Sequence, residues 1–265
     1  MMSHQQLLET LIAIDRISVH LARADRIVCM SQVLKEACEH VGIPAEKIVV
    51  LGNRVSLSRF RPAEQPNYDP RVLRALFIGR LQPQKNVHGL AQALALVKAQ
   101  GWQIRLDICG GIRMNRYLRQ ALSVLEASDW HYWGTVPNRQ LPARYHAADM
   151  YAGPSLFEGF QIPLIEALAC GKPCVASRQA PASEIIDAEV GALVDPDDPS
   201  DIARGLLELK SRLNDPGLRR GISEACRRRA IEHWSYQAIS AREAELYFEV
   251  LEACRGRDGQ PSRRE

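Results

Sequence analysis

Short apolar runs alternate with longer amphipathic segments along the chain from residue 72 onward. The short runs are rich in aliphatic and β-branched residues, as buried strands are. The longer segments repeat apolar residues every three or four positions, as one face of a helix does. This alternation predicts a parallel sheet covered by helices on both faces, which is a doubly wound α/β fold. The predicted strands are 72–78, 103–108, 130–134, 149–152, 173–177 and 192–194, and the predicted helices are 87–98, 116–127, 141–147, 199–213, 216–233 and 236–253.

The segment before residue 72 is patterned differently. Apolar positions at helical spacing over 7–21 predict an amphipathic helix that needs a partner surface. Residues 24–30 and 48–51 are typical of short buried strands, with a predicted helix over 32–40 between them. The polar, proline-bearing stretch 61–70 has the composition of a linker.

Residues 155–171 predict a loop that runs into a short helix. Pro163 suits the first helical turn and Gly171 suits the end of the helix, while Glu158 lies in the loop and Glu166 in the helix. A helix N-terminus can hold a phosphate through its unpaired N–H groups, and a carboxylate can accept hydrogen bonds from a sugar diol. The segment is therefore a candidate site for a sugar nucleotide, although similar segments are common on protein surfaces that bind no ligand.

Two cations, Arg80 and Lys85, follow the first predicted strand of the sheet. Ligands of open α/β sheets bind beyond the carboxyl ends of the strands. These two side chains could therefore neutralise a diphosphate and stabilise the charge on a departing nucleotide. The alternative is that both are solvated loop charges.

Bulk composition excludes several classes of protein. With 265 residues, of which 46% are hydrophobic, the chain can bury a substantial core. Its formal net charge of +3 is too small to indicate a nucleic-acid-binding protein. Seven cysteines without a C-x-x-C pair indicate reduced, mostly buried thiols, as expected of a cytoplasmic protein. There is neither an apolar run of ~18 residues nor the apolar core of a signal peptide, so we expect a soluble protein.

Several segments together resemble the retaining glycosyltransferases of the GT-B fold, family 4. Glu158, Gly159, Phe160, Pro163 and Glu166, followed by the Ala-Cys-Gly-Lys-Pro of 169–173, are similar to the family's motif of two glutamates separated by seven residues. The flanking segments that agree with the family are 76–86, 106–111, 145–149 and 191–199, so the resemblance runs from about residue 21 to about residue 251.

The resemblance implies two Rossmann-like domains that face each other across a cleft. By this comparison, 1–62 is a remnant of the N-terminal acceptor-side domain with the linker, and 63–235 is the GT-B C-terminal domain that binds the nucleotide sugar. Residues 236–254 are the C-terminal helix, which commonly crosses back to the first domain, and 255–265 are a disordered tail. About sixty residues before the linker are fewer than the usual ~100–150 of a complete domain, so we expect most of the acceptor half to be missing. We expect a homodimer mate, a partner chain or the C-terminal helix to cover the edge of the truncated sheet.

The resemblance also assigns roles to individual residues. Arg80 and Lys85 would bind the diphosphate of the donor, Glu158 would face the transferred sugar, and Glu166 would hold the ribose hydroxyls. The other donor-binding residues would line the sugar and the phosphates: Gly79, Gly159, Phe160, Gln161, Ile162 and Leu164. The expected catalytic residues are Glu158, Arg80 and Lys85. No metal cofactor is expected, because in this family the leaving phosphate itself helps to deprotonate the acceptor.

Two positions depart from the family pattern. Arg54 stands where the family usually has a glycine, and if that glycine has a positive φ, the arginine would strain the turn by ~1 kcal/mol. Gln161 stands where the family often has a second glycine, so its side chain could narrow or re-specify the sugar pocket.

Two functions of different classes remain open. One is a glycosyltransferase of polysaccharide biosynthesis that transfers a hexose from a nucleotide diphosphate sugar to a glycan or lipid acceptor, with retention. The other is a nucleotide-sugar-binding or interaction module without turnover, a truncated glycosyltransferase that needs a partner chain. A basic helix face formed by Arg219, Arg220 and 227–229 is of a kind that is usually solvated. It could also attract anionic lipid head groups and bring the protein to the inner face of the membrane.

Overall fold

The computed structural model describes residues 21, 23–65, 67–111, 116–179 and 181–258. The chain divides into two compact units, the first made of Met1–Asn53 with Gln237–Glu265 and the second of Arg54–Tyr236. These divisions lie near the predicted ones, after residues 62 and 235. Apart from residue 21, the helix predicted over 7–21 lies outside the described residues, and so do residues 259–265 of the predicted tail.

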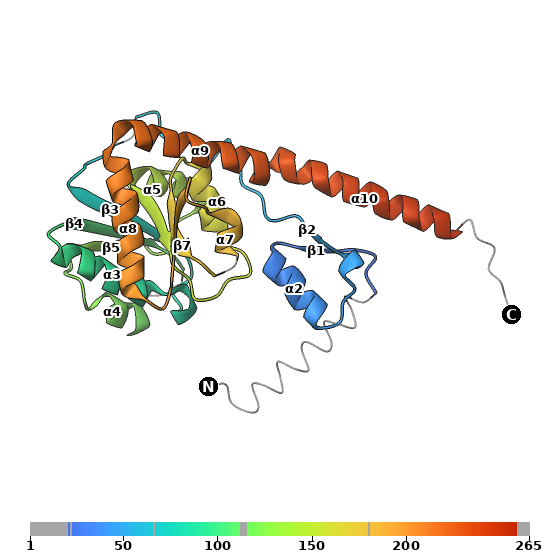
Figure 1. Ribbon diagram of the computed structural model, residues 1–265, viewed down its shortest axis with the longest axis horizontal. Helices are drawn as coiled ribbons and strands as arrows, with labels where there is room; N and C mark the ends of the chain where they lie inside the picture. The colour runs from blue at the N-terminus through green and yellow to red at the C-terminus, as the bar shows by residue number, and fades with distance from the viewer. Residues whose placement is uncertain (1–20, 22, 66, 112–115, 180, 259–265) are drawn as a thin grey trace, which may run out of the picture. The chain divides into compact units, whose positions relative to one another are not determined.

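The second unit is built on a sheet of six parallel strands (Figure 1). Their order is β5-β4-β3-β6-β7-β8, so the chain starts in the middle of the sheet, runs out to one edge and returns to build the other half. This order confirms the predicted doubly wound fold. The strands are β3 (Val72–Ile78), β4 (Gln103–Cys109), β5 (Trp130–Tyr132), β6 (Met150–Gly153), β7 (Cys174–Ser177) and β8 (Gly191–Val194).

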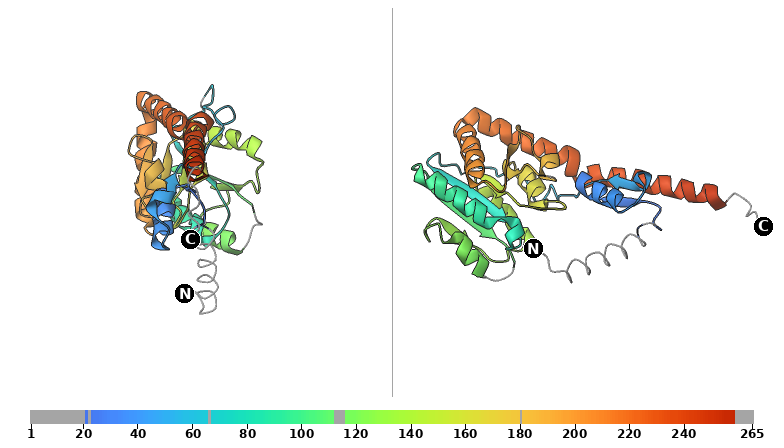
Figure 2. Two further views of the ribbon diagram at one scale, coloured as in Figure 1. Left: turned by 90° about the vertical axis from the view of Figure 1, so that its right-hand side faces the viewer. Right: turned by 60° about the horizontal axis from the view of Figure 1, so that its bottom comes forward.

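Helices cover both faces of this sheet, as Figures 1 and 2 show. Since β-α-β crossovers are right-handed, the helices after β3 and β4 lie on one face and those after β6 and β7 on the other. Helix α8 packs with α3 on the first face, and α9 packs with α6 on the second. The helices are α3 (Val87–Ala99), α4 (Arg116–Leu122), α5 (Leu141–Ala147), α6 (Ile162–Ala169), α7 (Ala182–Ile185), α8 (Pro199–Asn214) and α9 (Pro216–Trp234).

Two helices differ from the predictions. Helix α4 ends at Leu122 instead of 127, because the following segment forms a turn in which Asp129 Oδ2 accepts a hydrogen bond of 2.9 Å from the Glu126 N–H. Helix α7 has only four residues, which is too short to show a helical period in the sequence.

The chain reverses its direction across the sheet between β3 and β6. Strands β3 and β6 are neighbours, with Leu76 opposite Tyr151, although the chain leaves them toward opposite halves of the sheet. The turns after β3 and β4 approach closely there, since a Cβ on Gly110 would lie 1.9 Å from the Gly79 carbonyl oxygen. Open α/β sheets bind ligands beyond the carboxyl ends of the strands at such a reversal, which here lies between β3 and β6.

The first unit contains a smaller parallel sheet. Strands β1 (Ile27–Cys29) and β2 (Ile48–Val50) pair in parallel, and α2 (Gln32–His40) lies between them in the sequence, capped by the Ser31 side chain. The C-terminal helix α10 (Tyr236–Asp258) belongs to this unit from residue 237 onward. Within the unit, Arg242 Nη2 donates a hydrogen bond of 2.6 Å to the Val50 carbonyl. Among the described residues, no helix combines the length and the apolar character needed to span a bilayer.

Two expectations for the backbone are corrected. Residues 255–258 were expected to be disordered but continue α10, because each residue added to an existing helix adds a hydrogen bond without a new nucleus. Arg54 is not strained: the positive φ of that turn, 79°, falls on Gly52. Within the described part of the chain, Asn86 is the only residue other than glycine with a positive φ.

Candidate functional site

The loops that follow β3 and β6 lie against each other at the carboxyl edge of the sheet. The first contains a 3-10 turn, η2 (Pro83–Lys85), and the second spans 154–161. The Leu156 N–H donates a hydrogen bond of 2.9 Å to the Gln84 carbonyl, and Gln84 Nε2 donates one of 2.7 Å to the Phe157 carbonyl. The predicted diphosphate loop and the predicted glutamate loop therefore form one structure.

Lys85 and Glu158 meet at the centre of this structure. Lys85 Nζ forms a charged hydrogen bond with Glu158 Oε1, and the two side chains are only 15% and 10% exposed. The stem of Lys85 passes over Gly79, where an added Cβ would lie 3.8 Å from Lys85 Cδ. Removing one partner of such a largely desolvated pair is costly, because the other charge is then buried without a partner. The structure thus brings together Gly79, Lys85 and Glu158, as the sequence indicated.

Arg80 lies in the same loop, and its side chain is exposed. Its carbonyl accepts a hydrogen bond of 3.0 Å from the Gln82 N–H. The guanidinium has no hydrogen-bond or ion-pair partner within the described ranges, in contrast to the Lys85 ammonium. Arg80 is therefore a cation at the rim of the site that could turn toward an anion.

Gln161 does not face an open pocket. Its side chain is buried, and Nε2 donates hydrogen bonds of 3.1 Å to the Tyr151 hydroxyl and of 3.1 Å to the Gly153 carbonyl. A Cβ on Gly153 would lie 2.4 Å from this nitrogen, so the glycine leaves room for the amide. The expectation that Gln161 narrows the sugar pocket is corrected: the side chain ties the loop back onto β6.

The N-terminus of α6 points into the loop without a side-chain cap. Its first N–H, on Ile162, has no intrahelical partner, as in every α-helix, and the Ile162 side chain is 42% exposed. Phe160, just before it, is half-buried. The Leu164 N–H donates to the Gln161 carbonyl at 3.0 Å and the Leu164 side chain is buried, so its amide is less available to a ligand than we expected.

Glu166 lies deeper, on the second turn of α6, in a mostly apolar surrounding. The Tyr145 hydroxyl lies 2.9 Å from Glu166 Oε2 and 3.1 Å from the Pro163 carbonyl, and it has one hydrogen to donate. Burial raises the pKa of Glu166 to about 7, although hydrogen bonds from Tyr145 and Asn138 favour the ionised form. Burial and the nearby carboxylate also raise the pKa of Tyr145 well above its ordinary value. At neutral pH this carboxyl group can therefore hold or release a proton.

Sequence reasoning missed the groups that surround Glu166. Tyr145 belongs to a segment that resembles the family, but nothing in that segment assigned it a contact with Glu166. Asn138 comes from a 3-10 turn, η3 (Asn138–Gln140), and also accepts a hydrogen bond from Arg59. Tyr145 lies 21 positions before Glu166, and Arg59 lies 79 positions before Asn138, so no local spacing could have revealed these contacts.

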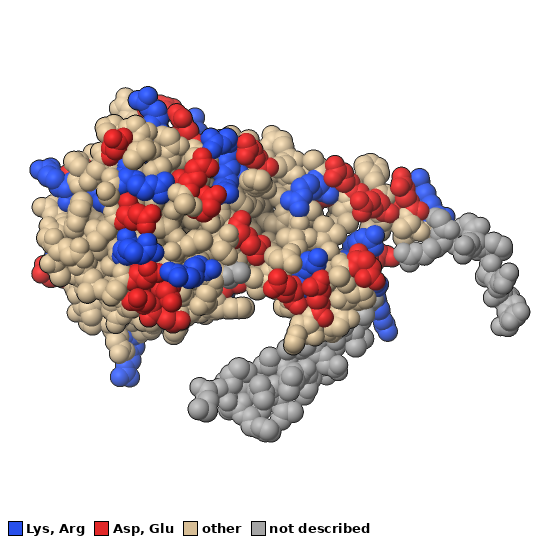
Figure 3. Space-filling model, in the orientation of Figure 1, with Lys and Arg blue, Asp and Glu red and all other residues tan. Residues whose placement is uncertain are grey.

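The predicted basic face is largely occupied by contacts within the protein. Arg227 donates hydrogen bonds to the carbonyls of Phe60 and Ala169, at 2.7 and 2.8 Å. Arg219, Arg228 and Arg229 also have partners: a backbone carbonyl, Glu189 and Asp187, respectively. On the face drawn in Figure 3, acidic and basic side chains are interspersed and do not form one basic patch. The helix therefore presents less unpaired positive charge than its sequence indicated.

The comparison of the sequence with protein families identifies the family of this chain. The profile of the family described as glycosyl transferases group 1 matches residues 60–229, which include both loops and α6. The chain belongs to this family. The D-inositol 3-phosphate glycosyltransferase of Thermobispora bispora is 32% identical to this chain over an alignment of 249 residues, which covers 86% of this chain and 57% of the relative. The O-antigen chain mannosyltransferase B of Escherichia coli is 34% identical over 137 residues, 51% of this chain and 36% of the relative.

Solved structures show the same fold. Sucrose-phosphate synthase from Thermosynechococcus elongatus superposes with a TM-score of 0.76 at 24% identity, covering 91% of this chain and 62% of the other. Anabaena HepE in complex with UDP-glucose gives a TM-score of 0.76 at 20% identity, covering 89% of this chain and 67% of the other. The α/β fold with its parallel six-stranded sheet thus matches that of GT-B glycosyltransferase structures. The chain spans about half the length of the curated relatives it matches.

Proposed function

We propose that this chain binds a nucleotide diphosphate sugar and transfers its hexose to a glycan or lipid acceptor, with retention of the anomeric configuration. The observation that carries the proposal is the meeting of Lys85 and Glu158 at the carboxyl ends of β3 and β6. That position is the ligand crevice of a sheet with this strand order. It combines a cation for phosphate with a carboxylate for sugar hydroxyls.

Donor binding would replace contacts that now exist within the protein. The Lys85 ammonium would bind the diphosphate in place of Glu158. The exposed Arg80 side chain would turn toward the diphosphate and bind it as well. The amide at the start of α6, on Ile162, would add a donor from a helix N-terminus. Glu166 would accept hydrogen bonds from the ribose diol in its ionised form.

Transfer would follow from the same contacts. The bond between the anomeric carbon and the diphosphate breaks, the acceptor oxygen bonds to that carbon from the same face, and the acceptor proton passes to the leaving phosphate. Arg80 and Lys85 would stabilise the charge that grows on the diphosphate, and Glu158 with Gly159 and Phe160 would orient the sugar. No metal ion enters the proposal, because these two cations supply the positive charge.

The names of the relatives support a hexose donor. They include a mannosyltransferase of Escherichia coli and a glycogen synthase of Mycobacterium tuberculosis, and HepE was solved with UDP-glucose. Since these proteins differ in donor and in acceptor, we propose the hexose class and no particular sugar.

Donor binding without transfer is a second candidate function. All the residues assigned to the donor lie in the compact unit Arg54–Tyr236, so this unit alone would hold the proposed donor site. A partner chain could then supply the acceptor side.

Calorimetry tests the first step of the proposal. UDP, GDP and ADP would be titrated into the chain and into Glu166→Ala, with Glu208→Ala as the matched control on an exposed helix face. We expect one nucleotide to bind and Glu166→Ala to weaken it about tenfold or more, as for a lost hydrogen bond to a charged group. Failure of all three nucleotides to bind would refute donor binding. An assay of sugar release or transfer with the matching nucleotide sugar then separates an enzyme from a binding module.

A further inference from the structure

Asn86, next to Lys85, has an unusual backbone for a buried residue. Its φ is 57° and its ψ is 38°, in the left-handed region, and its side chain is 1% exposed. Asparagine tolerates this region better than most residues do. A buried residue held there points to a local structure that requires it.

The Asn86 amide joins three loops. Nδ2 donates hydrogen bonds of 3.0 Å to the Pro154 carbonyl after β6 and of 2.6 Å to the Pro196 carbonyl after β8. Oδ1 accepts one of 3.2 Å from the Gly89 N–H and so caps α3. Both ends of the amide are therefore satisfied, and the carboxyl ends of β3, β6 and β8 are held together through one side chain.

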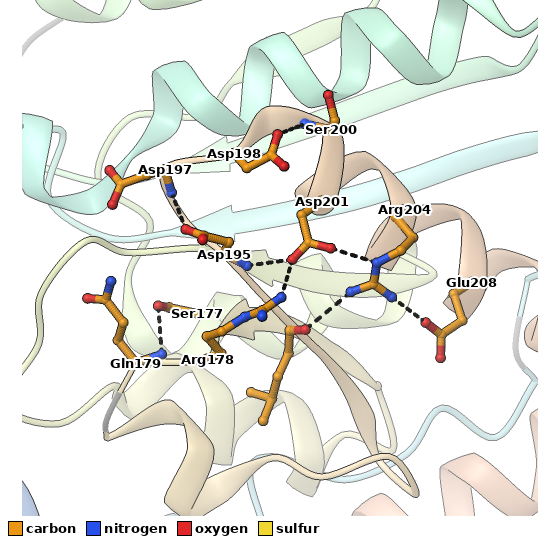
Figure 4. A network of polar contacts seen from close by, with 11 residues as sticks. Ser177, Arg178, Gln179, Asp195, Asp197, Asp198, Ser200, Asp201, Arg204 and Glu208 are labelled. Atoms are coloured by element: carbon orange, nitrogen blue, oxygen red, sulfur yellow. Dashed lines mark hydrogen bonds and ion pairs between the residues drawn. The ribbon is translucent and has the colours of Figure 1, made fainter.

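The loop after β8 is itself fixed, as Figure 4 shows. Asp201 accepts hydrogen bonds of 2.7 Å from the Asp195 N–H and of 2.6 Å from Arg204 Nε, and it also pairs with Arg178. Asp195 in turn accepts from the Asp197 N–H at 3.0 Å. This network holds the turn that contains Pro196, so the carbonyl that Asn86 contacts does not depend on Asn86 for its place.

Gln84, on the other side of Lys85, holds the glutamate loop by two hydrogen bonds, through its carbonyl to Leu156 and through its side chain to Phe157. We propose that Gln84 and Asn86 are positioning residues that set the spacing between Lys85 and Glu158, and so the fit of the site to a nucleoside diphosphate. This inference rests on the proposed donor site for its ligand, but the positioning itself can be measured without a ligand.

Two variants and one control test the inference. Asn86→Asp keeps the cap for Gly89 and the tolerance of a positive φ, but places an oxygen against the carbonyls of Pro154 and Pro196. Gln84→Ala removes only the hydrogen bond to Phe157 and should fold if Asn86→Asp does not. Asp215→Ala removes the cap of α9, where Asp215 accepts 2.8 Å from the Leu218 N–H, and serves as a control for a general loss of stability.

Hydrogen exchange at the Leu156 amide reports the position of the loop, and calorimetry with UDP, GDP and ADP reports the site. We expect each variant that folds to exchange Leu156 at least about tenfold faster and to bind the preferred nucleotide about tenfold more weakly. Asp215→Ala should lower Tm and change neither quantity. Any of three results would overturn the inference. The exchange rate of the Leu156 amide could be unchanged in the variants, or it could rise equally in Asp215→Ala. The third result is faster exchange at Leu156 with unchanged nucleotide affinity. If the wild type binds none of the nucleotides, donor binding fails, and Leu156 exchange alone then decides whether the two residues hold the loop.

Discussion

The buried carboxyl group of Glu166 makes the stability of the second unit depend on pH. Burial raises its pKa from 4.5 to about 7 in the folded protein. Because the folded state binds the proton more tightly than the unfolded state, the stabilisation by the protonated group is fully present below pH ~4.5 and is lost as pH rises through ~7. Glu166→Gln replaces the neutral acid by a neutral amide of the same shape, so it should remove this pH dependence.

The magnitude follows from the two pKa values. They differ by ~2.5, and each pKa unit corresponds to about 1.4 kcal/mol, so the full effect is on the order of 3 kcal/mol. Most of it, on the order of 2 kcal/mol, falls between pH 5 and pH 8, because the unfolded-state carboxyl is already partly ionised at pH 5. Glu166 is buried, so solvent screening does not reduce this value greatly.

The pH dependence of the free energy of unfolding can be measured by urea denaturation at pH 5, 6, 7 and 8. The proteins compared are the wild type, Glu166→Gln and the exposed control Glu208→Gln. We expect the free energy of unfolding of the wild type to fall relative to Glu166→Gln as pH rises, whereas Glu208→Gln should stay parallel to the wild type. A difference between wild type and Glu166→Gln that stays constant from pH 5 to pH 8 would refute the reasoning, since Glu166 would then have an ordinary pKa.

Three further predictions concern the same loops and the core. Nucleotide affinity measured by calorimetry should rise more from pH 6 to pH 8 in the wild type than in Glu166→Gln, because the ribose diol favours the ionised carboxylate, whereas the ionisation of the terminal phosphate affects both proteins alike; equal pH profiles of the two proteins would contradict this. Glu158→Gln should bind the nucleotide diphosphate more tightly, by about threefold or more, while losing transfer, because Lys85 no longer has a competing partner; weaker binding would show that the pair does not compete with the donor. Lys210→Met should lower the free energy of unfolding, measured in urea, by about 3 kcal/mol. The reason is that Asp149 loses the ammonium 2.9 Å away, in a site where both side chains are buried. A loss below ~1 kcal/mol would contradict the importance of this ion pair.

Local patterns predicted most of the elements of the second unit. The bounds of β3 and α5 agree with the sequence to the residue, because β3 is a largely apolar run that ends before Gly79, and α5 places Leu141 and Tyr145 one helical turn apart on a buried face. Helix α6 began and ended where Pro163 and Gly171 indicated, and Gly171 has a φ of 69°. The strand order could also be anticipated, since alternating strands and helices leave few topologies once crossovers are right-handed.

The side-chain contacts could not be predicted, because they join distant parts of the chain. Gln161 occupies a position where a pocket residue was expected, yet its side chain donates hydrogen bonds to Tyr151 and Gly153 of β6. Nothing in the sequence distinguishes Asn86 from other loop residues. Its role in joining the loops follows only from its hydrogen bonds to the carbonyls of Pro154 and Pro196. Residue types give the capacity to form hydrogen bonds, but the fold decides which partners are in reach.

The pairing of Lys85 with Glu158 depends on the order of the strands. The two residues are 73 positions apart, and they meet because β6 adds beside β3 instead of continuing outward from β5. Without the other loop, Lys85 and Glu158 would each be a loop charge open to solvent. Together they form a pair that is mostly shielded from water, and the proposed binding of a diphosphate would have to replace its attraction. The affinity of the proposed site therefore depends on the difference between two interaction energies, that of Lys85 with the diphosphate and that of Lys85 with Glu158. The residues that hold the loops at their present spacing influence both energies.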